Sequence, residues 1–88
     1  MDTVFEQMQI LRAGRYLASV SQDELAELAG VSRQTVLRIE KGDPGIGAEQ
    51  IDKVRLALVK LGLDFLPSAE GRGPAVAVRR IQGKKQKS

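Results

Sequence analysis

Apolar residues recur through positions 1–62 at the three- and four-residue spacing of helices that bury one face. This spacing predicts four helices, over about residues 3–18, 22–29, 33–41 and 48–62. The last three begin alike, with an apolar residue and a capping residue before a second apolar residue inside the helix. These starts are Val20-Ser21 with Leu25, Val31-Ser32 with Val36, and Ile46-Gly47 with Ile51. A mainly α fold is therefore expected.

The predicted helix ends agree with these starts. Gly30, Gly42 and Gly62 lie where a helix ends in a left-handed residue, which glycine adopts without steric cost. Asp43-Pro44-Gly45 keeps the third helix from running into the fourth. Gly14 conflicts with the first helix, since glycine costs about 1 kcal/mol relative to Ala there. A close crossing by another helix would explain it.

The pattern changes to that of short strands after the fourth predicted helix. Residues 63–66 and 75–79 are predicted strands, separated by the Pro/Gly-rich stretch 67–74. Because an isolated two-stranded hairpin is marginal in water, the strands are expected to pack on the fourth helix or to pair with a second chain. The sequence leaves open whether they pair within or between chains.

The net charge of +3 comes from the C-terminal end. Of the 14 Lys and Arg residues, five lie in the last ten positions, which contain no acid. The other nine basic residues share positions 1–78 with 11 acidic ones, a balance of −2. A basic tail suits nucleic acid, but it is about as often a solubilising end. The expected organisation is a helical unit over 1–62, a strand-loop-strand extension and possible dimer contact over 63–81, and a disordered basic tail over 82–88.

Composition excludes several classes of function. The chain has no Cys and no His, which removes disulfides, thiol nucleophiles and the usual zinc ligands. Ser, Asp and Glu are present, but no nucleophile has an evident base, so we expect no enzyme, no cofactor and no metal site. Two acids stand near the N-terminus where a signal peptide needs positive charge, and no apolar run approaches 18 residues. A cytoplasmic protein without a membrane partner is expected.

The stretch 21–42 has the pattern of a helix-turn-helix: a short helix, a tight turn at 29–32 and a second short helix. The side chains predicted to face the core are Leu25, Ala26, Leu28, Val36 and Ile39. Since each helical residue turns by about 100°, the face of the second helix opposite Val36 and Ile39 is exposed. That face carries Arg33, Gln34, Arg38 and Lys41, with Glu40 the one acid at its edge.

These residue types fit the major groove of DNA. Arg can direct two donors at the O6 and N7 acceptors of guanine, and Gln can both donate to and accept from adenine. Lys41 would add a phosphate contact that weakens with salt. Gln22, in the first turn of its helix, can donate to a phosphate beside free backbone N–H groups.

Residues 10–62 resemble the lambda-repressor/Cro-type helix-turn-helix family, also called the Xre family, whose motif the stretch SQDELAELAGVSRQTVLRIEKG (21–42) matches without a gap. The resemblance implies a four- to five-helix DNA-binding domain with the third helix in the major groove. It also implies that Gln22 clamps a phosphate, that Arg33, Gln34 and Arg38 read bases, and that Ser32, Thr35 and Lys41 lie near the backbone. In similar proteins residues at the positions of Arg15 and Glu40 form a partly buried ion pair. Gly47 departs from the family, which usually has a Ser or Thr cap there.

Two functions follow from this resemblance. The first is a sequence-specific regulator of transcription, a homodimeric repressor on a pseudo-palindromic operator, because a two-fold dimer places its reading helices about 34 Å apart in successive major grooves. The alternative is an antitoxin-like or regulatory module that binds a toxin or another regulator through the fourth helix and the strands. The operator, the direction of regulation and a phage, mobile-element or antitoxin context are not selected by the sequence.

The fourth predicted helix bears on this choice. Its expected core stripe is Ile51, Val54, Leu58 and Leu61, whereas Leu56, Val59 and Leu63 lie off it. An exposed second stripe would favour a partner surface, and strands folded back over it would not.

Overall fold

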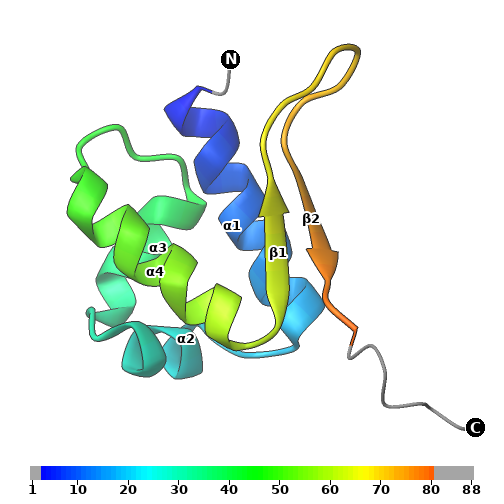
Figure 1. The fold of residues 1–88 in the computed structure, drawn as a ribbon. Coiled ribbons are helices and arrows are strands. Elements are labelled where there is room, and N and C mark those ends of the chain that lie inside the picture. Colours follow the sequence, from blue (N-terminus) through cyan, green and yellow to red (C-terminus); the bar gives the residue numbers. More distant parts are fainter. Residues whose placement is uncertain (1–2, 81–88) are drawn as a thin grey trace, which may run out of the picture.

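The computed structural model describes residues 3–80 as four helices and one antiparallel pair of strands (Figure 1). The elements, in chain order, are α1 (Val4–Ala18), α2 (Gln22–Ala29), α3 (Arg33–Glu40), α4 (Ala48–Lys60), β1 (Leu63–Leu66) and β2 (Ala75–Val78). The predicted class, mainly helical with a C-terminal hairpin, is confirmed. The tail over 82–88, for which disorder is predicted, lies outside the described residues.

Side-chain caps start three of the four helices. Ser21 and Glu24 form the predicted capping box at α2, and Thr3 and Glu6 form a second one at α1. At α3 the hydroxyl of Ser32 accepts a hydrogen bond from the backbone N–H of Thr35. No side chain caps α4, which starts after Gly47, so the departure from the family pattern leaves backbone donors there without such a partner.

The helix ends contain the predicted glycines in left-handed conformations, with φ of 73° at Gly30, 76° at Gly42 and 104° at Gly62. At the end of α1 the same role falls to Ser19, with φ of 59°. Nothing in the sequence signals this residue, because serine is not a preferred left-handed cap. Helix starts and stops are therefore local properties of this chain with one exception.

A single aliphatic core joins the helices to β1. Its buried members are Met8, Leu11, Leu25, Ala26, Val36, Ile39, Ile51, Val54, Ala57, Leu58 and Leu63. Leu28, which was expected to face inward, is 58% exposed. The buried face of α2 is centred between Leu25, Ala26 and Ala29, and Leu28 lies about 100° away from that centre. The prediction for Leu28 is therefore wrong.

Two residues near the end of α4 also exchange the places predicted for them. Leu61, assigned to the core stripe, is exposed, because α4 ends at Lys60 and helical spacing no longer applies there. Ala57 is buried in the stripe instead. Leu63, placed off the stripe, is buried because it belongs to β1 and faces the core from the strand.

The strands pair within the chain and lie against α1 as well as α4 (Figure 1). The register pairs Leu63 with Val78 and Phe65 with Val76, and Phe65 and Val76 both pack on the core. A Cβ placed on Gly14 would lie 3.1 Å from Cδ1 of Leu63 and 3.2 Å from Cζ of Phe65. The close crossing at Gly14 is therefore made by a strand, not by the helix that was suggested.

Within residues 3–80, none of the helices combines the length and the apolar character needed to cross a membrane.

Gly14→Val is expected to lower the free energy of unfolding by about 1–3 kcal/mol, because its methyl groups would overlap the side chains of Leu63 and Phe65. Chemical denaturation followed by circular dichroism measures this. Ala13→Val is the matched control, since Ala13 is exposed on the same helix and only the helix propensity changes, by about 0.6 kcal/mol. Replacing Gly by Val would by itself gain about 0.4 kcal/mol of helix propensity, so a Gly14→Val variant that loses no stability would mean that β1 does not restrict position 14.

Candidate nucleic-acid interface

The turn between α2 and α3 is held by the backbone and by the core. Gly30 takes the left-handed conformation, and the N–H of Val31 returns to the carbonyl of Ala26 at 3.1 Å. Leu25 on α2 and Val36 on α3 are each 1% exposed. The two helices are therefore fixed against each other through their inner faces, which leaves the outer face of α3 toward solvent.

The outer face of α3 carries the side chains that the sequence predicts. Arg33, Gln34, Arg38 and Lys41 are all exposed. The Gln34 amide bonds to no other residue within 3–80, so its donor and its acceptor are both available. We refer to these four residues as the reading face.

Acids from neighbouring elements meet the two arginines of the reading face. Nε of Arg38 donates to Oδ2 of Asp43 at 2.8 Å, and Nε of Arg33 lies 3.3 Å from Oδ1 of Asp23. Glu40, which was expected at the edge of this face, has a side chain only 7% exposed and turns toward α1. The reading face is thus free of acids from α3 itself, but α2 and the loop after α3 each supply one.

Asp43 is the residue of this surface that the sequence pattern does not reveal. The triplet from Asp43 to Gly45 predicts only a break between helices. Its carboxylate also accepts the N–H of Gly45 at 2.8 Å, the short-range bond that aspartate commonly makes in turns. That hydrogen bond and the one from Arg38 lower the pKa of Asp43, so it is ionised.

Ser32 and Thr35, which the family resemblance places near the DNA backbone, bond to each other. Their hydroxyl oxygens are 3.0 Å apart, and the Ser32 hydroxyl accepts the N–H of Thr35 at 3.0 Å. Both residues therefore have a capping role at the start of α3. Ser32 is exposed and Thr35 is half-buried.

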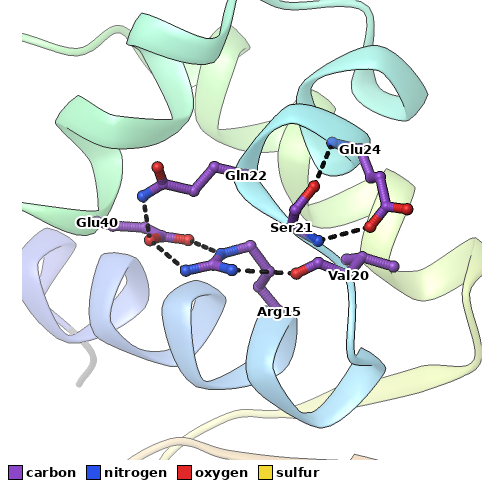
Figure 2. A network of polar contacts seen from close by, with 6 residues as sticks. All are labelled: Arg15, Val20, Ser21, Gln22, Glu24 and Glu40. Carbon is purple, nitrogen blue, oxygen red and sulfur yellow. Dashed lines mark hydrogen bonds and ion pairs between the residues drawn. The ribbon is translucent and has the colours of Figure 1, made fainter.

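The Arg15–Glu40 ion pair is present and joins α1 to α3 (Figure 2). Arg15 donates from Nε to Oε2 at 2.5 Å and from Nη2 to Oε1 at 3.0 Å. Nη1 donates to the carbonyl of Val20 at 3.0 Å. The two side chains are 10% and 7% exposed, and the hydrogen bonds to Glu40 raise the pKa of Arg15.

Gln22 belongs to the same network, and Nε2 donates to Oε1 of Glu40 at 3.0 Å (Figure 2). Because an amide nitrogen carries two hydrogens, one donor is left over, together with the amide oxygen. The side chain borders an open hollow of about 380 Å³ at the start of α2. The hollow is lined by Arg15, Tyr16, Ser21, Gln22, Asp23 and Arg33.

Glu40→Ala is expected to lower the free energy of unfolding by about 3–5 kcal/mol, because the Arg15 charge would stay in a nearly buried place without its partner. Urea denaturation measures the change, and Glu40→Gln serves if the alanine variant does not fold. Asp52→Ala removes one partner of an exposed pair with Arg55 and should cost less than about 1 kcal/mol. If Glu40 variants lose no more than Asp52→Ala, the buried pair does not secure α3.

A comparison with protein families agrees with this geometry. A family model described as helix-turn-helix matches residues 11–58, which is more than half of the chain and includes α2, the turn and α3. No curated protein matches the chain. The matched family comprises DNA-binding regulators and is not a family of enzymes. With its capped α2, left-handed turn and solvent-facing α3, the chain belongs to the Xre/lambda-repressor-type helix-turn-helix family.

Proposed function

We propose that this protein is a sequence-specific transcriptional regulator, a homodimeric repressor that inserts α3 into the major groove of a pseudo-palindromic operator. The observation that carries the proposal is the two-sidedness of α3. Val36 and Ile39 are buried, and the reading face on the opposite side is exposed. Repression needs only that the bound protein occupies DNA that the transcription machinery must reach.

The reading face divides into base-reading and phosphate-binding residues. Gln34 has a free donor and a free acceptor, the pair of groups that adenine requires. Arg33 and Arg38 are suited to guanine, whose O6 and N7 accept two parallel donors. Lys41 follows the last turn of α3 and supplies a point charge for a phosphate. Ser32 and Thr35 complete the proposed set as hydroxyl donors near the backbone of the DNA.

Gln22 is proposed to hold a phosphate at the start of α2. The backbone N–H groups of Gln22 and Asp23 precede the first helical hydrogen bonds, so they can donate to an anion. The second amide hydrogen of Gln22 adds one donor beside them. Glu40 holds the amide from the other side and fixes its direction before DNA arrives.

Gln34→Ala is expected to weaken binding to the preferred DNA about fivefold or more, because an amide that reads adenine contributes about 1–3 kcal/mol. Fluorescence anisotropy at two salt concentrations measures this, with DNA from upstream of the protein's own reading frame and with duplexes selected from a random library. Gln9→Ala, an exposed glutamine of α1, is the control and should bind as the wild type does.

A shortened chain that ends at Arg80 distinguishes DNA binding by the reading face from DNA binding by the basic tail. The proposal requires that this shortened chain keeps its sequence preference. The proposal is wrong if binding is weak and falls steeply with salt, if Gln34→Ala does not change it, and if removing the tail abolishes it. The basic terminal residues would then hold the DNA by charge alone.

The proposed dimer uses the outer edge of β2. The N–H of Arg79 donates to the carbonyl of Gly62 at 2.8 Å, so the alternation of an antiparallel ladder turns the backbone groups of Val76 and Val78 away from β1. Within residues 3–80 no strand pairs with that edge, and β2 itself contains no charged residue of the kind that blunts edges. A second copy can pair there antiparallel about a two-fold axis.

Val78→Lys is expected to convert the dimer to a monomer, because a charged side chain on an edge strand opposes pairing. Sedimentation equilibrium over a concentration series gives the mass. Leu56→Lys on α4 is the matched control, since the two residues are 53% and 50% exposed, and it should remain dimeric. A monomer from Leu56→Lys and a dimer from Val78→Lys would move the interface to α4, and a monomeric wild type would end the dimer proposal.

A further inference from the structure

Arg38 and Asp43 are joined twice across the end of α3. The backbone N–H of Asp43 donates to the carbonyl of Arg38 at 3.0 Å. The side chain of Arg38 returns the contact, since Nε donates to Oδ2 of Asp43 at 2.8 Å. The two bonds close a ring through the end of the helix, so the turn holds the backbone of Asp43 where its carboxylate can reach Arg38.

The carboxylate of Asp43 is itself held in place. Oδ1 accepts the N–H of Gly45 at 2.8 Å, which leaves Oδ2 directed at Arg38. Pro44, between them, has a fixed φ and limits how the loop can rearrange. A Cβ on Gly45 would lie 3.4 Å from Nη2 of Arg38, so the guanidinium rests beside a residue that has no side chain.

This arrangement leaves one edge of the guanidinium available. Nε is used by Asp43, whereas Nη1 and Nη2 donate to no other residue within 3–80. These two nitrogens carry parallel N–H groups that match the O6 and N7 acceptors of guanine. An arginine held in this way loses less side-chain freedom when it meets a base.

We propose that Asp43 is a positioning residue that fixes the Arg38 guanidinium for reading one base pair, and so determines specificity without touching DNA. The inference rests on the proposed function, in which Arg38 reads a base. It adds to that function a residue outside the helix-turn-helix motif. It also predicts which edge of Arg38 faces the DNA.

Arg33 provides an internal contrast on the same face. Its Nε forms an ion pair with Oδ1 of Asp23 at 3.3 Å, the side chains are 66% and 74% exposed, and the side chain of Asp23 makes no hydrogen bond within the described residues. An exposed pair of this kind contributes little and breaks easily. Asp23→Ala is therefore the matched control for Asp43→Ala: each variant removes one carboxylate that pairs with an arginine of the reading face.

The experiment compares affinities for the preferred duplex and for duplexes with single base-pair changes. The preferred duplex is the one that the wild type selects from a library with a random window of about 20 base pairs. Asp43→Ala should lower the discrimination at one base pair roughly tenfold, at the same base pair as Arg38→Ala. Asp23→Ala should change discrimination at every position by less than about twofold.

Two other roles for Asp43 give different results. If its charge only repels phosphates, Asp43→Ala tightens binding to all duplexes equally and leaves discrimination unchanged. If Asp43 only supports the loop, Asp43→Ala weakens binding to the same extent whether or not Arg38 is present. If Asp43 positions Arg38, the effect of Asp43→Ala on discrimination disappears in the Arg38→Ala background. Either result overturns the inference.

Failure of the inference can be told apart from failure of the proposed function. If Arg38→Ala lowers discrimination and Asp43→Ala does not, α3 still reads DNA and the positioning role is wrong. If Arg38→Ala changes discrimination at no base pair, the base-reading assignment of Arg38 is itself wrong. Both the positioning role and the base-reading assignment are supported by two results together. Asp43→Ala and Arg38→Ala must lower discrimination at the same base pair, and the double variant must discriminate no less than Arg38→Ala alone.

Discussion

The ion pair between Arg15 and Glu40 is the constraint on which the orientation of α3 depends. The aliphatic core brings the helices together, but burial of apolar surface has no preferred direction. Hydrogen bonds have a preferred direction, and Arg15 donates three of them, two to the carboxylate of Glu40 and one to the carbonyl of Val20. Gln22 adds a fourth bond from α2. Within residues 3–80 no buried side-chain polar atom lacks a partner, so the network is complete, and α1, α2 and α3 meet at one carboxylate.

The residues that face outward from this frame differ in how firmly they are held. Arg38 is bonded to an aspartate that is also hydrogen-bonded within its own loop, and Arg33 lies beside an exposed carboxylate, that of Asp23. The Gln34 side chain bonds to no other residue within 3–80. A rigid donor pair favours one base strongly, whereas a free amide can adjust to the groove as it docks. The reading face therefore combines preorganised and adaptable groups within two turns of one helix.

Local signals predicted the helices, and contacts between distant segments account for what the sequence did not show. Caps and glycines act within four residues, which is why the bounds of α2 and α3 were predictable. The Arg15–Glu40 pair spans 25 positions and was expected only through the family resemblance. The neighbour of Gly14 is a strand about 50 residues later, and the partner of Arg38 lies beyond the helix end, where the spacing rules of a helix no longer hold.

Adjacent residues of α1 connect the hairpin to α3. The side chains of Leu63 and Phe65 pack closely against Gly14, and the next residue, Arg15, forms the ion pair with Glu40 of α3. If two copies pair through β2, each α3 is tied to the two-fold axis by the path from β2 through β1, Gly14 and Arg15 to Glu40. Operator half-sites about 34 Å apart demand a fixed separation between the two reading helices. In such a dimer, a substitution at Gly14 that moves the hairpin would therefore change the preferred half-site spacing, even though position 14 lies on α1, outside the proposed reading face.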